Sequence, residues 1–308
     1  MPLDPSPAHD AVVIGGSYAG LSAAIQIARA RRSVCVIDAG SPRNRFAGAS
    51  HGVFGQDGAQ PRAMIAAARA DVARYPGVRM IAETAVDARA VTGGFAVTLG
   101  DGGTITATKL VLAFGITDVL PELPGLAERW GRTVLHCPYC HAFEHAGGRL
   151  GVLWTAPLSP HQAMLIADWG TTTLLLDGHG PLDAAVRTRL DRRGVAIEPA
   201  PIRALQGGDG TLSSVVLDDG RAVAIDALFL AARTRLNSPI AERLGCALDD
   251  GPFGPVIRTD AAKLTTVPGV YAAGDIARAP HNASWAAADG ATAGISLHQA
   301  LVFEPLAA

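Results

Sequence analysis

The stretch DAVVIGGSYAG, residues 10–20, decides the fold, because a short apolar strand runs directly into a tight glycine turn. An Ala-rich helix is expected to follow as far as about residue 29. The turn is made of small residues, which let a pyrophosphate approach the backbone and the helix N-terminus: Gly15, Gly16, Ser17, Ala19 and Gly20. Serine replaces the second glycine of the usual GxGxxG motif, so the match is weaker than an intact one.

A second apolar strand, residues 34–37, ends at Asp38, which lies 23 residues after Gly15 (38 minus 15). At this position a dinucleotide-binding fold places the carboxylate that takes the ribose hydroxyls. Residues 10–38 therefore predict a complete βαβ unit with a nucleotide site.

The C-terminal part carries a second half of such a site. The stretch VPGVYAAGD, residues 267–275, predicts a strand that ends in Gly274-Asp275, and a helix is expected over about residues 284–300. The Asp275 carboxylate can bind a polyol such as the ribityl chain of a flavin, and the backbone N–H groups of Trp285 and Ala286 can face the flavin ring. Taken singly, these features also suit an ordinary turn and a core tryptophan. Because both ends of the chain suit one long nucleotide, they predict FAD.

Four cysteines are present, and two of them form the motif Cys137-Pro138-Tyr139-Cys140. Cys35 and Cys246 lie in apolar surroundings and are expected to be buried core residues. A zinc site would have to recruit nearby histidines, which are His136, His141 and His145. Structural zinc usually draws two ligands from each of two separate segments, so a redox-active dithiol is the favoured interpretation.

Composition excludes several classes of partner. The net charge of -2 and the absence of a basic cluster argue against nucleic acid and against an anionic membrane surface. The first residues have neither the basic region nor the apolar core of a secretory signal, and no apolar run approaches the length of a membrane span. A dithiol that must cycle suits a reducing cytosol, so a cytoplasmic location is expected.

With these motifs, the chain resembles the low-molecular-weight thioredoxin reductases, and most closely their relatives, the FAD-dependent dithiol oxidases that close disulfides in small molecules such as gliotoxin and holomycin. The resemblance also rests on the strand LVLAFG, residues 110–115, which includes Ala113 and Gly115, and on CPYCHAFE, residues 137–144. It implies an α/β protein with two Rossmann-like, three-layer ββα domains, the second inserted into the first. The expected FAD domain is residues 1–119 and 240–308, the expected insert is residues 120–239, and a homodimer is expected.

The resemblance also implies roles for single residues. Cys137 would exchange with the substrate, whereas Cys140 would face the flavin. The reductases carry an acid where this chain has His141, and an imidazole there can act as the general base for thiol oxidation. His136 could assist, or it could simply cap a turn. Four further residues are expected near the flavin, with a solvated loop as the alternative: Arg43, Asn44, Arg45 and His51.

The insert departs from the reductase pattern. Its first expected turn, in LGVLWTAPLSP (residues 150–160), lacks the glycines that NADPH binding requires and holds Trp154 and two prolines instead. The next strand ends at Asp177, which suits a ribose hydroxyl but repels a 2'-phosphate. The sequence therefore disfavours NADPH bound in the usual mode.

Together these features predict an FAD-dependent dithiol/disulfide oxidoreductase that oxidises a small dithiol or a thioredoxin-like protein and passes electrons to dioxygen or another acceptor. One alternative is a thioredoxin reductase that uses NADPH atypically or uses ferredoxin. The other is a flavin-binding redox sensor without catalytic turnover.

Overall fold

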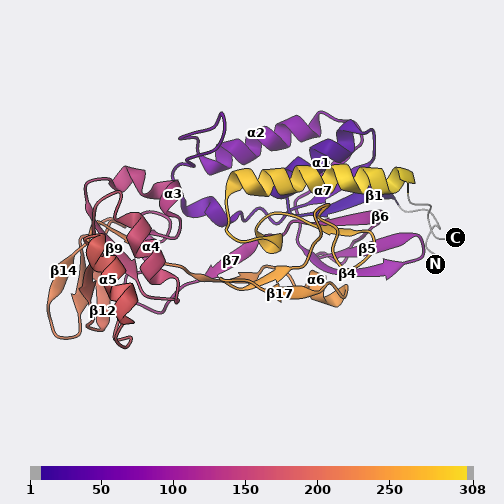
Figure 1. Ribbon diagram of the computed structural model, residues 1–308. Helices are drawn as coiled ribbons and strands as arrows, with labels where there is room; N and C mark the ends of the chain where they lie inside the picture. Colours follow the sequence, from indigo (N-terminus) through magenta and orange to yellow (C-terminus); the bar gives the residue numbers. More distant parts are fainter. Residues whose placement is uncertain (1–7, 304–308) are drawn as a thin grey trace. The chain divides into compact units, whose positions relative to one another are not determined.

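The computed structural model describes residues 8–303, which form two compact units (Figure 1). Unit 1 consists of the described residues up to Arg45, of Arg62–Thr117, and of the described residues from Thr234 onward. Unit 2 consists of Phe46–Pro61 and Asp118–Arg233. The domain boundaries expected from the sequence stay a prediction. The units differ from them by placing residues 46–61 and 118–119 in the second unit and residues 234–239 in the first.

Unit 1 contains a seven-stranded sheet with the main order β3-β2-β1-β6-β5-β4, in which β19 also pairs with β6. Its strands are β1 (His9–Ile14), β2 (Val34–Ile37), β3 (Val78–Ile81), β4 (Ala85–Val91), β5 (Gly94–Leu99), β6 (Thr104–Leu112) and β19 (Val270–Ala272). Because β1 and β19 both run parallel to β6, their carboxyl ends lie at the same edge of the sheet. The two glycine turns predicted from opposite ends of the chain therefore meet at one edge.

The strands of unit 1 alternate between two packed faces, as the period of two in a strand requires. Ala11 and Val13 pack on one face with α1 (Tyr18–Arg29) and α7 (Ala283–Phe303). Val12 and Ile14 pack on the other face with residues of β4 and β5. The result is a three-layer ββα arrangement. The remaining elements of this unit are η1 (Arg43–Phe46), α2 (Pro61–Ala73), α6 (Ile240–Arg243), β17 (Leu248–Asp250), β18 (Pro255–Ile257) and η4 (Asp275–Ala277).

Unit 2 repeats the architecture with a parallel sheet of order β11-β10-β9-β15-β8. These strands are β8 (Val134–Leu135), β9 (Arg149–Leu153), β10 (Thr171–Leu175), β11 (Ala196–Glu198) and β15 (Ala227–Phe229). One face packs against α4 (Ser159–Ile166) and α5 (Ala184–Arg192), and the other against the antiparallel sheet of β12 (Ile202–Gln206), β13 (Ser214–Leu217) and β14 (Ala222–Ala224). Short helices η2 (Ala127–Arg129), α3 (Pro138–His141) and η3 (Phe143–His145) precede β9. The chain passes between the units through β7 (Ile116–Val119) and β16 (Arg233–Leu236). The predicted fold class, with the second Rossmann-like unit inserted into the first, is confirmed.

In unit 1, α1 and α7 pack with their backbones in direct contact. A Cβ atom added at Gly290 would lie 2.0 Å from the carbonyl oxygen of Ala19, and one added at Gly294 would lie 2.5 Å from that of Ala23. Helices that approach this closely leave no room for a side chain, so both glycines are required by packing. None of the described helices is long and apolar enough to cross a membrane.

This contact predicts that Gly290→Ala destabilises the protein by about 1–3 kcal/mol, because overpacking forces the helices apart. Alanine is a better helix former than glycine by about 1 kcal/mol, so intrinsic propensity alone would have the opposite sign. Urea unfolding measures the difference. Gly208→Ala is the control, since an added Cβ there meets nothing within 4 Å. Equal or greater stability of Gly290→Ala would contradict the packing argument.

Candidate active site

The turn after β1 brings the backbone of three segments together. Gly15 has φ +112°, and a Cβ atom there would lie 2.1 Å from the carbonyl oxygen of Ala113. A Cβ atom at Gly20 would lie 1.7 Å from the carbonyl oxygen of Gly15. Ser17 is the N-cap of α1, and its side chain makes no capping hydrogen bond within the described part of the chain. The helix therefore begins without a side chain of its own over its N-terminus.

Asp38 lies beside this turn, as the sequence predicts. Its Oδ1 accepts a hydrogen bond from the Gly16 N–H at 3.0 Å. Its Oδ2 forms an ion pair with Arg69 of α2. The role of Asp38 toward ribose hydroxyls stays a prediction, and Arg69 was not foreseen, since nothing in the pattern of α2 indicates which of its arginines faces the turn.

An ion pair joins two segments of the predicted cofactor site that lie far apart in the sequence. The Arg43 guanidinium lies 3.0 Å from the Asp275 carboxylate, and both side chains are largely buried. Gly274, with φ +81°, lies so close to α1 that a Cβ atom there would be 2.9 Å from the Cβ of Ala19. The structure thus brings together Ala19, Arg43, Gly274 and Asp275, which the sequence places separately near one flavin, and their role in binding it stays a prediction.

The side chain of Asn44 indicates whether the site between Arg43 and Asp275 is built for a ligand. Its Nδ2 donates to the Tyr18 hydroxyl at 3.0 Å, while its Oδ1 is buried and has no hydrogen-bond partner among the described residues. A buried amide oxygen without a donor is costly, so it suits a bound group that donates a hydrogen bond. Arg45 instead donates to the carbonyl of Pro42 at 3.1 Å and braces η1. The glycine turn, the acidic Asp275 and this unsatisfied amide fit FAD.

The start of α7 is capped by its own neighbour. The Asn282 Oδ1 accepts from the N–H groups of Ser284 at 2.7 Å and Trp285 at 3.4 Å, and the Ala286 N–H donates to the Asn282 carbonyl at 2.9 Å. A role for the Trp285 and Ala286 N–H groups toward the flavin stays a prediction. It requires the flavin to replace Asn282 as the acceptor of these N–H groups. Gly115 accepts the Asn237 N–H at 3.1 Å, near the end of β6.

In unit 2 the two cysteines of the CxxC motif form a disulfide with an S–S distance of 2.02 Å. Cys137 is the N-cap of α3, Pro138 opens the helix, and Cys140 lies within it. Both cysteines are partly exposed. Because each sulfur is bonded to the other, neither is available as a metal ligand in this state.

Histidines and one carboxylate surround the dithiol helix. His141 follows Cys140, and burial lowers the pKa of its imidazole below the usual 6.5, an effect that His51 and His145 reinforce and Glu144 opposes. The rings of His51 and His141 meet edge to face, with centroids 6.5 Å apart. His141 is therefore held neutral near pH 7, as a general base requires. His136 packs its ring near Trp130, with centroids 6.0 Å apart.

The turn after β9 in unit 2 is closed by its own side chain. The Ser159 Oγ accepts hydrogen bonds from the N–H groups of Thr155 at 3.1 Å and Ala156 at 3.2 Å. Ser159 is fully buried. In a nucleotide-binding turn, such N–H groups point at the phosphates. Here the turn satisfies them internally, a feature that the sequence reading of Trp154 and the prolines did not foresee.

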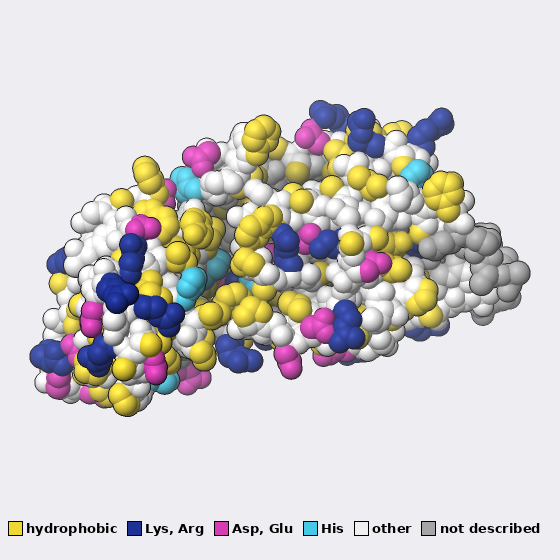
Figure 2. All heavy atoms as spheres, viewed as in Figure 1, with side chains coloured by type: hydrophobic (Ala, Val, Ile, Leu, Met, Phe, Trp, Pro, Cys, Tyr) yellow, Lys and Arg dark blue, Asp and Glu magenta, His cyan; other side chains and the backbone are white. Residues whose placement is uncertain are grey.

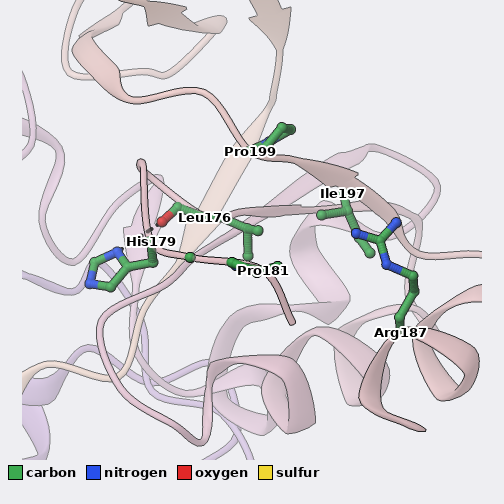
Figure 3. A pocket seen from close by; sticks show the side chains of 7 residues that line it. Leu176, His179, Pro181, Arg187, Ile197 and Pro199 are labelled. Atoms are coloured by element: carbon green, nitrogen blue, oxygen red, sulfur yellow. Dashed lines mark hydrogen bonds between the residues drawn. The ribbon is translucent and has the colours of Figure 1, made fainter. Parts of the chain in front are cut away.

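The carboxyl end of β10 is also occupied by internal contacts. The Asp177 carboxylate accepts a hydrogen bond from the Ile202 N–H at 2.7 Å. The ring centroids of Trp154 and His179 lie 5.9 Å apart. A pocket of about 410 Å³ remains beyond them (Figure 3). It is lined by Leu176, His179, Gly180, Pro181, Arg187, Ile197 and Pro199.

Comparison with known proteins identifies the family to which the chain belongs. Residues 9–290 match the family described as Pyridine nucleotide-disulphide oxidoreductase. The chain belongs to this family. It is 34% identical over 283 residues to thioredoxin reductase tcpT of Claviceps purpurea, with 86% of each chain covered, and 34% identical over 306 residues to thioredoxin reductase sirT of Leptosphaeria maculans, with 92% of each covered. An oxidoreductase from Agrobacterium tumefaciens has the same fold, with a TM-score of 0.92 at 44% identity, covering 96% of this chain and 99% of that one.

Membership of the pyridine nucleotide-disulphide oxidoreductase family confirms three predictions. The chain is similar to thioredoxin reductase-like flavoproteins, its cofactor is FAD, and it is a flavin-dependent thiol-disulfide oxidoreductase. The individual site residues stay predictions, supported by the positions described above.

The largely buried ion pair predicts that Asp275→Ala and Arg43→Ala each weaken FAD binding by about 10- to 100-fold, since a hydrogen bond to a charged group contributes about 1.5–3 kcal/mol. Flavin fluorescence of the refolded or deflavinated protein gives the dissociation constant. Arg258→Ala breaks an exposed pair with Asp249 in the same unit and is expected to change nothing. Normal FAD affinity in both site variants would contradict the assignment.

Proposed function

We propose that the protein oxidises a small dithiol through Cys137 and Cys140 and does not take its electrons from NADPH. The observation that carries the proposal is the closed turn after β9, where Ser159 binds the N–H groups of Thr155 and Ala156. A pyrophosphate would have to displace a fully buried hydroxyl that already satisfies both donors. Without a nucleotide to deliver hydride, the dithiol itself is the proposed reductant.

The exchange chemistry follows from the disulfide and its neighbouring base. A substrate thiol loses its proton to neutral His141, and the resulting thiolate attacks Cys137. The S–S bond breaks, a mixed disulfide forms at Cys137, and the proton passes from His141 to the departing Cys140 thiolate. The second substrate thiol then displaces Cys137, so that the substrate leaves as a disulfide and both cysteines are thiols.

The electron balance needs one further acceptor. Two electrons have moved from the substrate to the cysteine pair, and FAD supplies the two-electron acceptor that restores the disulfide. Dioxygen is the proposed final oxidant, which gives hydrogen peroxide, so that the net reaction consumes one dithiol and one dioxygen for each disulfide formed.

The surface around the dithiol supports a small, apolar substrate. Phe54, Tyr139 and Phe143 are exposed large side chains in the two segments that flank the disulfide. These segments, residues 46–61 and 134–148, contain no Lys or Arg. An uncharged or cationic dithiol with apolar groups therefore suits this face better than an acidic one. The homodimer and the cytoplasmic location stay predictions.

A second candidate is a reductase that binds NADPH in an unusual way. The pocket beyond β10 is lined by Arg187, and basic side chains gather on the surface over α5 (Figure 2). Arginine is well suited to phosphate recognition. This candidate requires the nucleotide to bypass the turn after β9.

Cysteine variants test the proposed function. Cys140→Ser is expected to abolish flavin reduction by dithiothreitol, and Cys137→Ser to keep FAD but block exchange with substrate, because the two sulfurs act in sequence. Stopped-flow absorbance of the flavin measures the first effect, and oxygen uptake measures turnover. Cys246→Ala is the matched control, because Cys246 is a buried free cysteine in unit 1. Turnover retained by both dithiol variants would refute the proposal, and multiple turnovers by the wild type would exclude a purely sensory role.

A further inference from the structure

The segment Phe46–Pro61 leaves the cofactor unit and joins unit 2. Its first residue is anchored there, since a Cβ atom added at Gly131 would lie 2.6 Å from the Cβ of Phe46. Two backbone hydrogen bonds close the loop. The Ser50 N–H donates to the Ala59 carbonyl at 2.8 Å, and the Gly58 N–H donates to the Ser50 carbonyl at 2.9 Å. The segment is therefore a built loop that lies against the unit carrying the dithiol.

This loop holds His51 between two carboxylates. The His51 Nδ1 lies 3.6 Å from Asp57, and its Nε2 lies 3.4 Å from Glu144. Asp57 is itself fixed by the loop, because its Oδ1 accepts the Gly52 N–H at 2.8 Å. A ring with a partner on each nitrogen has one preferred orientation.

The His51 ring also lies beside His141, the proposed general base for thiol exchange. The His51 and His141 rings are nearly perpendicular, with centroids 6.5 Å apart. Glu144 and His145 are the other titratable groups that act on His141. His51 was expected from the sequence to approach the flavin edge. That role stays a prediction, and the described contacts of His51 connect it to Glu144 and His141, within the unit that holds the disulfide.

We propose that His51 is a positioning residue for the dithiol: held by Asp57 and Glu144, it sets its ring against His141 and keeps that imidazole in place as the neutral base for thiol exchange. The proposal rests on the proposed function for its catalytic consequence. Its electrostatic part stands by itself, because His51 and Glu144 act on His141 with opposite signs. His51 lowers the pKa of His141, whereas the Glu144 carboxylate raises it.

The test combines a titration with kinetics. Imidazole NMR of the oxidised protein, with no substrate present, reads the pH at which His141 takes a proton. In the wild type we expect that midpoint below the usual 6.5, because burial lowers the pKa of the imidazole. We expect it to move to higher pH in His51→Asn and to lower pH in Glu144→Gln. His161→Asn, which changes a histidine of α4 outside this cluster, is the control and is expected to leave it unchanged.

The kinetic readout is the rate of flavin reduction by dithiothreitol as a function of pH. We expect His51→Asn to reduce this rate about tenfold at pH 7, a smaller loss than the ~10²–10⁴-fold typical of removing a general base such as His141. Its acidic limb is expected to shift to higher pH together with the NMR midpoint.

The outcomes separate the two claims. An unchanged His141 midpoint in His51→Asn, or an equal shift in His161→Asn, overturns the positioning role whatever the turnover. A wild-type protein whose flavin is not reduced by the dithiol overturns the proposed function, whereas opposite shifts in the two variants still establish the coupling of His51 to His141.

Discussion

Direct backbone contact without intervening side chains is the constraint on which unit 1 depends. Gly20 lets α1 start against the turn after β1, and Gly290 and Gly294 let α7 lie on the backbone of α1. This packing brings the last long helix of the chain onto the first, so that Gly274 and Asp275 reach the turn built by residues 15–20. A cofactor site assembled from both ends of the sequence follows from it.

Unit 2 repeats the strand-turn-helix arrangement but completes its turn differently. In unit 1 the N-terminus of α1 has no side-chain cap among the described residues, whereas in unit 2 the Ser159 hydroxyl accepts two N–H groups of the turn. The same topology thus leaves a place for phosphate in one unit and fills it in the other. The dithiol, the neutral His141 and the loop that carries His51 occupy the unit whose turn is filled. This difference between the two turns supports the proposal that electrons enter through thiols.

Much of this was predictable because the signals are local. The βαβ pattern of residues 10–38 and the strand ending in Asp275 each follow from short-range periodicity and turn chemistry, and they placed α1, β2 and β19 correctly. The CxxC motif likewise identified the disulfide. The family resemblance places Arg43 and Asp275 separately near one flavin, but no pattern in the sequence predicts their ion pair.

What could not be predicted depends on contacts between segments distant in sequence. The attachment of residues 46–61 to unit 2 depends on the approach of Phe46 to Gly131, which no periodicity indicates. The partners of His51 among the described residues, Asp57, Glu144 and His141, are likewise not predictable from the sequence, and its expected approach to the flavin stays a prediction. The sequence also does not predict the pairing of Arg69 with Asp38 or the hydrogen bonds that Ser159 accepts, because tertiary packing sets the orientation of these side chains.

The central claim, that electrons enter from a dithiol and not from NADPH, is tested most directly by anaerobic titration of the FAD-loaded protein with each reductant. The account predicts that the visible absorbance of the flavin bleaches with one equivalent of dithiothreitol, returns when air is admitted, and is unaffected by NADPH. Prompt bleaching by NADPH would show that a nucleotide does reach the flavin despite the closed turn at Ser159, and it would contradict the account.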